Sequence, residues 1–197
     1  MRMIAAALAL TLAASPALAE KLSLGAISQY LNQLQSTKGA FTQINADGSI
    51  STGEIAIKRP GRARFDYNPP ERALVIVGGG SVAIFDQKTG ATPEQYPIGR
   101  TPLKIILQRN VNLGASGIVV GHTFDGTSTI VTAQDPANPE FGTIEMVFTA
   151  NPVELRQWII RDEGGQPTTV ILGEMDTSAR LPNGLFNIQA EIAKLRN

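Results

Sequence analysis

Residues 53–70 read Gly53-Glu-Ile-Ala-Ile-Lys-Arg-Pro-Gly-Arg-Ala-Arg-Phe-Asp-Tyr-Asn-Pro-Pro70. Apolar and polar residues alternate on both sides of a Pro-Gly dipeptide, which is typical of two strands joined by a tight turn. Because successive side chains of a strand point to opposite faces, Ile55 and Ile57 share one face, and Phe65 and Tyr67 share a face of the return strand. The segment therefore predicts a β-hairpin with one apolar face.

Arg59 is the exception on this apolar face. Strand parity places it on the same side as the two isoleucines, whereas Glu54 and Lys58 are expected to face water. A guanidinium among apolar side chains needs carboxylate or carbonyl partners, because an unpaired buried charge is costly. Two alternatives remain open: Arg59 extends to solvent at the rim of the sheet, or residues 58–64 form a solvated basic edge that discourages aggregation.

The rest of the chain continues this pattern, with turn signals about every ten residues. The predicted strands are Ile50–Arg59, Arg62–Tyr67, Ala73–Val77, Val82–Asp86, Gly117–Phe124, Thr127–Ala133, Gly142–Thr149, Leu155–Arg161 and Thr168–Glu174. Short strands with short turns favour an antiparallel meander. No repeat or low-complexity linker interrupts the sequence, so residues 20–197 are predicted to form a single domain.

Two segments have helical rather than strand periodicity. Residues 24–34 carry apolar residues at helical spacing. In residues 101–110, Thr101 is a candidate N-cap, Pro102 would take the first helical position, and Leu103, Ile106 and Leu107 would share one face. A further short helical turn is expected over residues 111–116. Because strands continue afterwards, this insertion is expected to lie across a face or the mouth of the sheet.

The N-terminus has the features of a secretory signal peptide over residues 1–19. Arg2 precedes an apolar run of about eleven residues, which is too short to span a bilayer, and Ala17-Leu18-Ala19 is a small-residue cleavage pattern. Cleavage before Glu20 would release the domain into the periplasm of a bacterial envelope. No cysteine follows that could be lipidated.

Composition and motifs argue against several classes of function. The chain has 17 Lys and Arg against 17 Asp and Glu, one histidine and no cysteine, which disfavours nucleic-acid binding, thiolate chemistry and metal sites. No nucleophile elbow or phosphate-binding loop is found, so neither an enzyme nor a cofactor is predicted. A secreted hydrolase using His122 as general base remains the catalytic alternative.

The order of motifs resembles the periplasmic lipoprotein-carrier family of LolA type. The resemblance extends to about residue 110, and its most specific part is the block from Lys58-Arg59-Pro60 to Phe65-Asp66-Tyr67. The other matching segments are Phe41-Thr-Gln43, Gly53–Ile57, Gly80–Asp86, Tyr96-Pro97 and Thr101–Leu103. The sequence departs from the family at Ile84-Phe85, where a tryptophan is common, and at Leu185–Ile192, which lacks the usual Pro-Gly ending of the C-terminal strand.

The resemblance implies an α+β, mainly antiparallel fold, an incomplete or half β-barrel with a helical lid over an apolar cavity. It implies a monomeric periplasmic chaperone that carries acylated lipoproteins from an inner-membrane ABC transporter to an outer-membrane acceptor. The alternative is a half-barrel lipid-binding or envelope-sensor module for another lipid. The related LolB receptors are themselves lipidated, which this chain cannot be without a cysteine.

The resemblance also assigns a role to Arg59. Arg59 would bond to lid segments, which we expect within residues 101–116, and hold the empty carrier closed. The acyl-chain cavity is expected to involve Ile55, Ile57, Phe65, Tyr67, Leu103, Ile106, Leu107 and Phe148.

Overall fold

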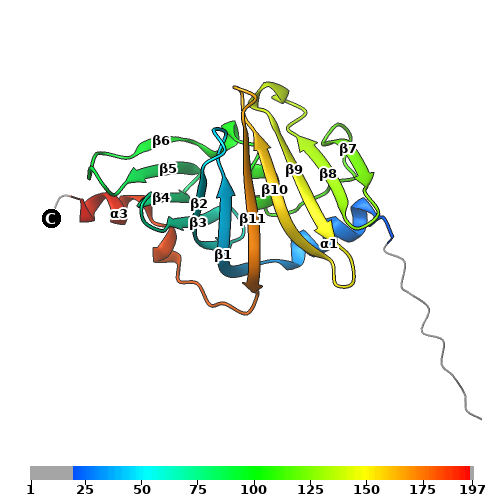
Figure 1. Cartoon of the computed structure of the whole chain (residues 1–197), viewed down its shortest axis with the longest axis horizontal. Coiled ribbons are helices and arrows are strands. Elements are labelled where there is room, and N and C mark those ends of the chain that lie inside the picture. Colours follow the sequence, from blue (N-terminus) through cyan, green and yellow to red (C-terminus); the bar gives the residue numbers. More distant parts are fainter. Residues whose placement is uncertain (1–19, 196–197) are drawn as a thin grey trace, which may run out of the picture.

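The computed structural model describes residues 20–195, and their dominant feature is one antiparallel sheet of eleven strands in the order β6-β5-β4-β3-β2-β1-β11-β10-β9-β8-β7 (Figure 1). The strands are β1 (Ser36–Ile44), β2 (Ile50–Lys58), β3 (Arg62–Tyr67), β4 (Ala73–Gly78), β5 (Ser81–Asp86), β6 (Glu94–Pro97), β7 (Val119–Phe124), β8 (Thr129–Gln134), β9 (Thr143–Thr149), β10 (Glu154–Arg161) and β11 (Pro167–Asp176). Among these eleven described strands, β1 and β11 are the one neighbouring pair that is distant in sequence.

The sheet is curved but open, because β6 and β7 end it without pairing to each other (Figure 1). The predicted hairpin is present: Ile55 pairs with Phe65 and Ile57 with Ala63. The predicted class, mainly antiparallel α+β with an incomplete barrel, is therefore confirmed. Strands β1 and β6 are absent from the predicted strands, and the predicted signal peptide lies outside the described residues.

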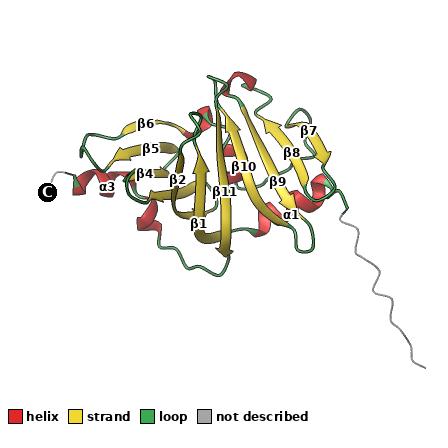
Figure 2. Ribbon diagram, viewed as in Figure 1, coloured by secondary structure: helices red, strands yellow, loops and turns green. Residues whose placement is uncertain are grey.

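The inner face of the sheet, which carries Ile55, Ile57 and Phe65, is covered by α1 (Leu24–Gln33) and by residues 98–118. The side chain of Ser23 caps α1, and the helix buries Ile27 and Leu31 as its apolar spacing predicts. Figure 2 shows α1 and the other short helices around the broad sheet. Among the described residues, none of these helices has the length and apolar character needed to span a membrane.

Residues 98–118, here called the strap, contain less helix than predicted. They comprise the 3₁₀ turn η1 (Ile98–Arg100), the short helix α2 (Lys104–Leu107) and turns. The N-cap prediction for Thr101 is wrong, because Leu103 takes that position and no side chain caps α2. The predicted helical turn over residues 111–116 is also wrong: Asn112 bonds the amide of Gly114, a side-chain contact that competes with helix.

The outer face, which carries Ala56 and Arg64, is covered by the C-terminal part of the chain. The 3₁₀ turn η3 (Asn183–Phe186) and helix α3 (Ile188–Lys194) pack there, and a third 3₁₀ turn, η2 (Pro139–Phe141), connects β8 to β9. The segment Leu185–Ile192 therefore ends in a helix, not in a strand. The expectation that Lys58 faces water is corrected, because its ammonium donates a hydrogen bond of 2.6 Å to the Leu181 carbonyl.

Gly53 of β2 leaves room for the ring of Phe41, which lies on the neighbouring strand β1. It pairs with Phe41 of β1, and a Cβ at Gly53 would press against the ring of Phe41 and the backbone oxygen of Asp66. We expect Gly53→Ala to lower the free energy of unfolding by about 1–3 kcal/mol, as overpacking does. Urea denaturation measures the change, with Gly99→Ala, which meets open space, as the control. Equal losses in both variants would contradict the steric argument.

Candidate functional site

Arg59 lies in the turn after β2, and its side chain points into the protein. Only 5% of the residue is exposed, so the predictions of a rim position or a solvated edge are wrong for it. Its Nη2 donates to the carbonyl of Gln108 at 2.5 Å and lies 3.4 Å from the carbonyl of Arg109 and 3.3 Å from Asn32 Oδ1. The guanidinium therefore joins the β2–β3 turn, the strap and α1.

The other nitrogens of this guanidinium are not satisfied. Nε and Nη1 are buried and have no hydrogen-bond partner among the described residues. Burial lowers the pKa of Arg59 because the charged form has lost its water. A buried donor without a partner costs free energy, so Arg59 holds the strap through one nitrogen while the rest of the group opposes burial.

Two polar side chains of α1 also hold the strap, and sequence reasoning missed both. Asn32 bonds Val111 twice, accepting from its amide at 2.8 Å and donating to its carbonyl at 2.9 Å. Ser28 Oγ accepts from the amide of Leu113 at 3.0 Å. The available signal was their spacing: four residues apart, they lie on one side of the helix next to its apolar stripe.

Two ion pairs hold the strap to strand ends. Lys104 pairs with Asp135, which follows β8, and Arg100 pairs with Glu163 in the β10–β11 hairpin at 3.1 Å. The hydrogen bond from Lys104 is the largest cause that lowers the pKa of Asp135, followed by one from Asn138. Both ion pairs therefore fix the strap to the half of the sheet that consists of β7–β11.

The lowered pKa of Asp135 predicts a pH-sensitive strap. The ion pair stabilises the packed strap above the ordinary aspartate pKa of about 3.9, and this contribution is lost as the pH falls through the lowered value. At neutral pH we expect Asp135→Asn to reduce hydrogen-exchange protection of Leu107 and Gln108 roughly two- to fivefold, since a partly exposed pair contributes little. The control is Glu140→Gln, and unchanged protection in Asp135→Asn would contradict the role of the pair.

The structure brings most predicted cavity residues together in a packed interior. Ile55, Ile57, Phe65, Ile106, Leu107 and Phe148 are all buried in one cluster. Tyr67 packs at its edge and donates to Gln43 at 2.7 Å, and burial raises the pKa of Tyr67 to about 12. The strap contributes Ile105, Val111 and Leu113 to the same cluster. The inner face is therefore filled largely by the protein's own strap.

An open cleft of about 660 Å³ adjoins this packed region. Its apolar wall consists of Val75, Val77, Val82, Ile84, Tyr96, Leu103 and Ile160. Leu103 is the one predicted cavity residue in this wall. Sequence reasoning missed the others, although β4 and β5 have apolar residues at successive positions, which indicates burial on both faces. The cleft, which we call the inner cleft, can accept an apolar chain beside the strap.

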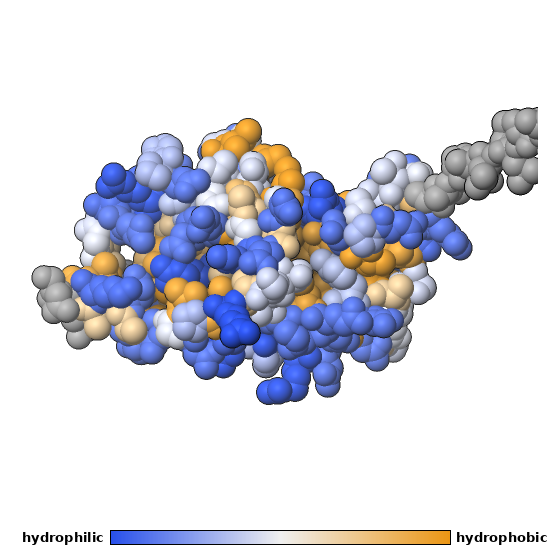
Figure 3. Space-filling model, turned by 90° about the horizontal axis from the view of Figure 1, so that it is seen from below, coloured by the Kyte–Doolittle hydropathy of each residue, from blue (hydrophilic) through white to orange (hydrophobic). Residues whose placement is uncertain are grey.

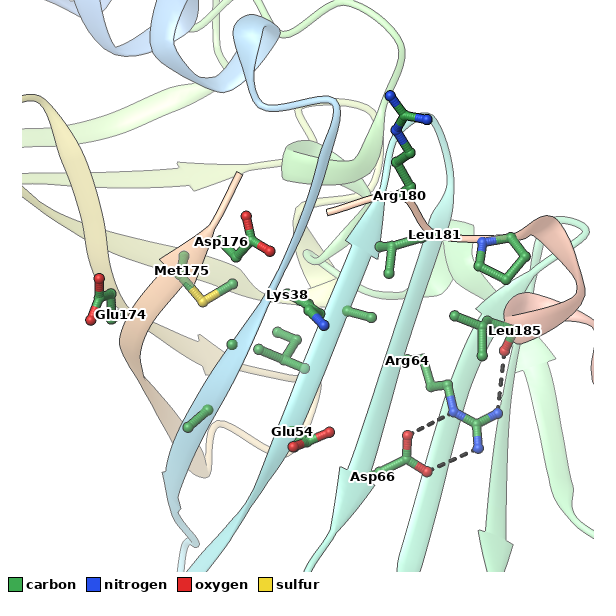
Figure 4. Close-up of a pocket in the computed structure, with 15 residues that line it drawn as sticks. Lys38, Glu54, Arg64, Asp66, Glu174, Met175, Asp176, Arg180, Leu181 and Leu185 are labelled. Carbon is green, nitrogen blue, oxygen red and sulfur yellow. Dashed lines mark hydrogen bonds and ion pairs between the residues drawn. The ribbon is translucent and has the colours of Figure 1, made fainter. Parts of the chain in front are cut away.

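A larger hollow of about 830 Å³ lies on the outer face and has a different character (Figure 4). Charged side chains of both signs line it, and Arg64 bonds Asp66 at 2.7 Å and the carbonyl of Leu185 at 3.2 Å. Figure 3 likewise shows a mainly hydrophilic surface with separate apolar patches when the molecule is seen from below. The inner cleft is therefore the better candidate for an apolar ligand.

His122 contacts the backbone of the segment before α1. It lies on edge strand β7, and its Nε2 is 2.9 Å from the carbonyl of Leu22. Lys21 in turn donates to the backbone carbonyl of His122 at 2.8 Å. Within residues 20–195, no serine or threonine hydroxyl bonds the imidazole. The ring fastens the segment before α1 to the sheet edge.

Comparison with known proteins identifies the family. Residues 32–189 match the family described as "Outer membrane lipoprotein carrier protein LolA". An outer-membrane lipoprotein carrier protein of Azotobacter vinelandii is 33% identical over 190 residues, covering 92% of this chain and 90% of the relative. One from Neisseria meningitidis is 23% identical, covering 89% and 87%. A LolA superfamily structure from Nitrosomonas europaea covers 84% of this chain and 98% of its own, with 10% identity and a TM-score of 0.43. This chain belongs to the LolA family of outer membrane lipoprotein carrier proteins.

Proposed function

We propose that this chain is a periplasmic carrier that takes the acyl chains of lipoproteins from an inner-membrane ABC transporter and delivers them to an outer-membrane acceptor. It acts as a monomer and releases its cargo chemically unchanged, so no catalytic residue is needed. The observation that carries the proposal is the open apolar cleft beside a strap that fills the rest of the inner face.

The apolar interior supports binding of long acyl chains. Burial of a chain gains about 0.8 kcal/mol per methylene, so a dozen methylenes contribute on the order of 10 kcal/mol before costs. A carrier must also release its cargo, so this gain has to be offset. In our proposal the offset is the packed strap, because cargo must displace its apolar side chains from the cluster.

Arg59 serves as the latch of this closed state. In this proposal it bonds Gln108 only while the strap is packed, and the hydrocarbon part of an acyl chain offers no replacement acceptor. Loading therefore removes the partner of a buried charge, and delivery restores it. The residues predicted to line the acyl-chain cavity, including Ile106 and Leu107 of α2, pack against one another in the empty carrier. In the loaded carrier they would contact the acyl chains instead.

Release of a labelled lipoprotein from spheroplasts tests the proposal. The purified wild-type chain is expected to bring lipoprotein into the soluble fraction. Ile84→Gln, which places an amide in the wall of the inner cleft, should reduce this release several-fold. The control is Val120→Gln on exposed edge strand β7. No release by the wild-type chain, or equal release by Ile84→Gln, would refute binding in this cleft.

A further inference from the structure

The rim of the inner cleft carries an excess of negative charge. Glu94 of β6 and Asp162 and Glu163 of the β10–β11 hairpin line it, and Arg100 is the one cation among the lining residues. The formal charge of the lining is therefore −2, whereas the whole chain has 17 cationic and 17 acidic residues. The negative rim is a local feature of the cleft.

Only part of this charge is neutralised. Arg100 pairs with Glu163, and its guanidinium also lies 5.9 Å from the centre of the Phe141 ring. Glu94 and Asp162 form no ion pair within the described part of the chain. Burial is the main cause that raises the pKa of Tyr96, a residue of the apolar wall. The negative charges of Glu94 and Asp162 raise this pKa further, so both carboxylates act on the wall.

We propose that Glu94, Asp162 and Glu163 make the inner cleft select uncharged acylglycerol lipid over anionic phospholipid. The inference rests on the proposed function, since it assumes that acyl chains enter this cleft. Phospholipids and lipoproteins carry similar acyl chains, so the apolar wall alone discriminates little between them. The difference lies at the glycerol, which bears a phosphate in a phospholipid and a cysteine thioether in a lipoprotein.

The position of the rim suits this discrimination. With the chains in the cleft, the glycerol lies at its mouth, next to the carboxylates. An anionic phosphate there meets lining residues with a net charge of −2. Interactions of exposed charges act over about one Debye length, which is roughly 8 Å at physiological ionic strength. We expect this repulsion to weaken the binding of anionic phospholipid about tenfold, because charges next to an apolar surface interact more strongly than charges in bulk water.

Lipid transfer from phosphatidylcholine vesicles tests the selection. Pyrene-labelled diacylglycerol and pyrene-labelled phosphatidylglycerol of the same chain length are each offered to the purified chain. The wild type is expected to take up diacylglycerol about tenfold better. The triple variant Glu94→Gln, Asp162→Asn and Glu163→Gln should remove most of this preference, and high salt should reduce it in the wild type. The control is Glu71→Gln, Glu140→Gln and Glu174→Gln, exposed carboxylates outside the cleft lining.

The outcomes separate the two proposals. Uptake of both lipids without preference by the wild type, or an unchanged preference in the triple variant, would overturn the selective role of the rim and leave acyl-chain binding standing. Uptake of neither lipid would overturn both. A loss of preference in the control variant would assign selection to overall charge, which also overturns a role specific to the rim.

Discussion

Arg59→Leu is expected to load lipoprotein normally and to deliver it roughly ten- to a hundredfold more slowly than the wild type. The hydrogen bond from Arg59 to the Gln108 carbonyl exists only in the packed strap, and bonds to charged donors contribute about 1.5–3 kcal/mol. Leucine removes this advantage of the closed state. It also removes the cost of leaving a guanidinium without carbonyl partners beside lipid, so the loaded state is stabilised.

The measurement is the time course of transfer of labelled lipoprotein from loaded carrier to outer-membrane vesicles. Arg59→Lys is the matched variant: it retains the charge and one donor group, so its delivery rate should fall between those of Arg59→Leu and the wild type. Delivery by Arg59→Leu at the wild-type rate would show that the strap closes without help from residue 59. Failure of Arg59→Leu to load would instead indicate a folding role.

The inner face of the sheet could be predicted from the sequence because strand parity is a local property. The alternation through Ile55, Ile57, Ala63 and Phe65 places all four side chains on one side, as the structure has them. Parity also placed Arg59 on that side. Parity does not predict the partner of the guanidinium, which lies 49 residues further along the chain. The expectation of a partner within residues 101–116 came from the family resemblance.

The outer face was predicted less well, because its environment depends on long-range packing. Lys58 and Arg64 do project from the face opposite the isoleucines, but the segment from Ala179 to Leu185 returns to cover them. Nothing in the polar pattern of β2 and β3 indicates this cover. The strap was over-predicted as helix for a related reason: Asn32 of α1 bonds the backbone of Val111 and holds it in an irregular conformation.

Phe148→Ala is expected to lower the free energy of unfolding by about 3–5 kcal/mol, a large share of the 5–15 kcal/mol typical of a domain. Phe148 was predicted to line an acyl-chain cavity, yet its exposure is 0%, and its ring packs edge-on against Tyr30 of α1 at 6.1 Å. A ring that faced an empty cavity would lose few contacts on truncation. Truncation of a fully packed ring, in contrast, leaves a void and removes contacts that support α1.

Urea denaturation measures this loss, with Leu103→Ala as the matched control, since Leu103 is partly exposed in the inner cleft and should cost far less. A small effect of Phe148→Ala, similar to that of Leu103→Ala, would contradict the packed interior described above. The void also has a functional consequence. It lies under the helix whose Asn32 and Ser28 hold the strap, so we expect strap amides to lose protection before the sheet unfolds. That order of events would show that the packing of α1, as well as Arg59, keeps the empty carrier closed.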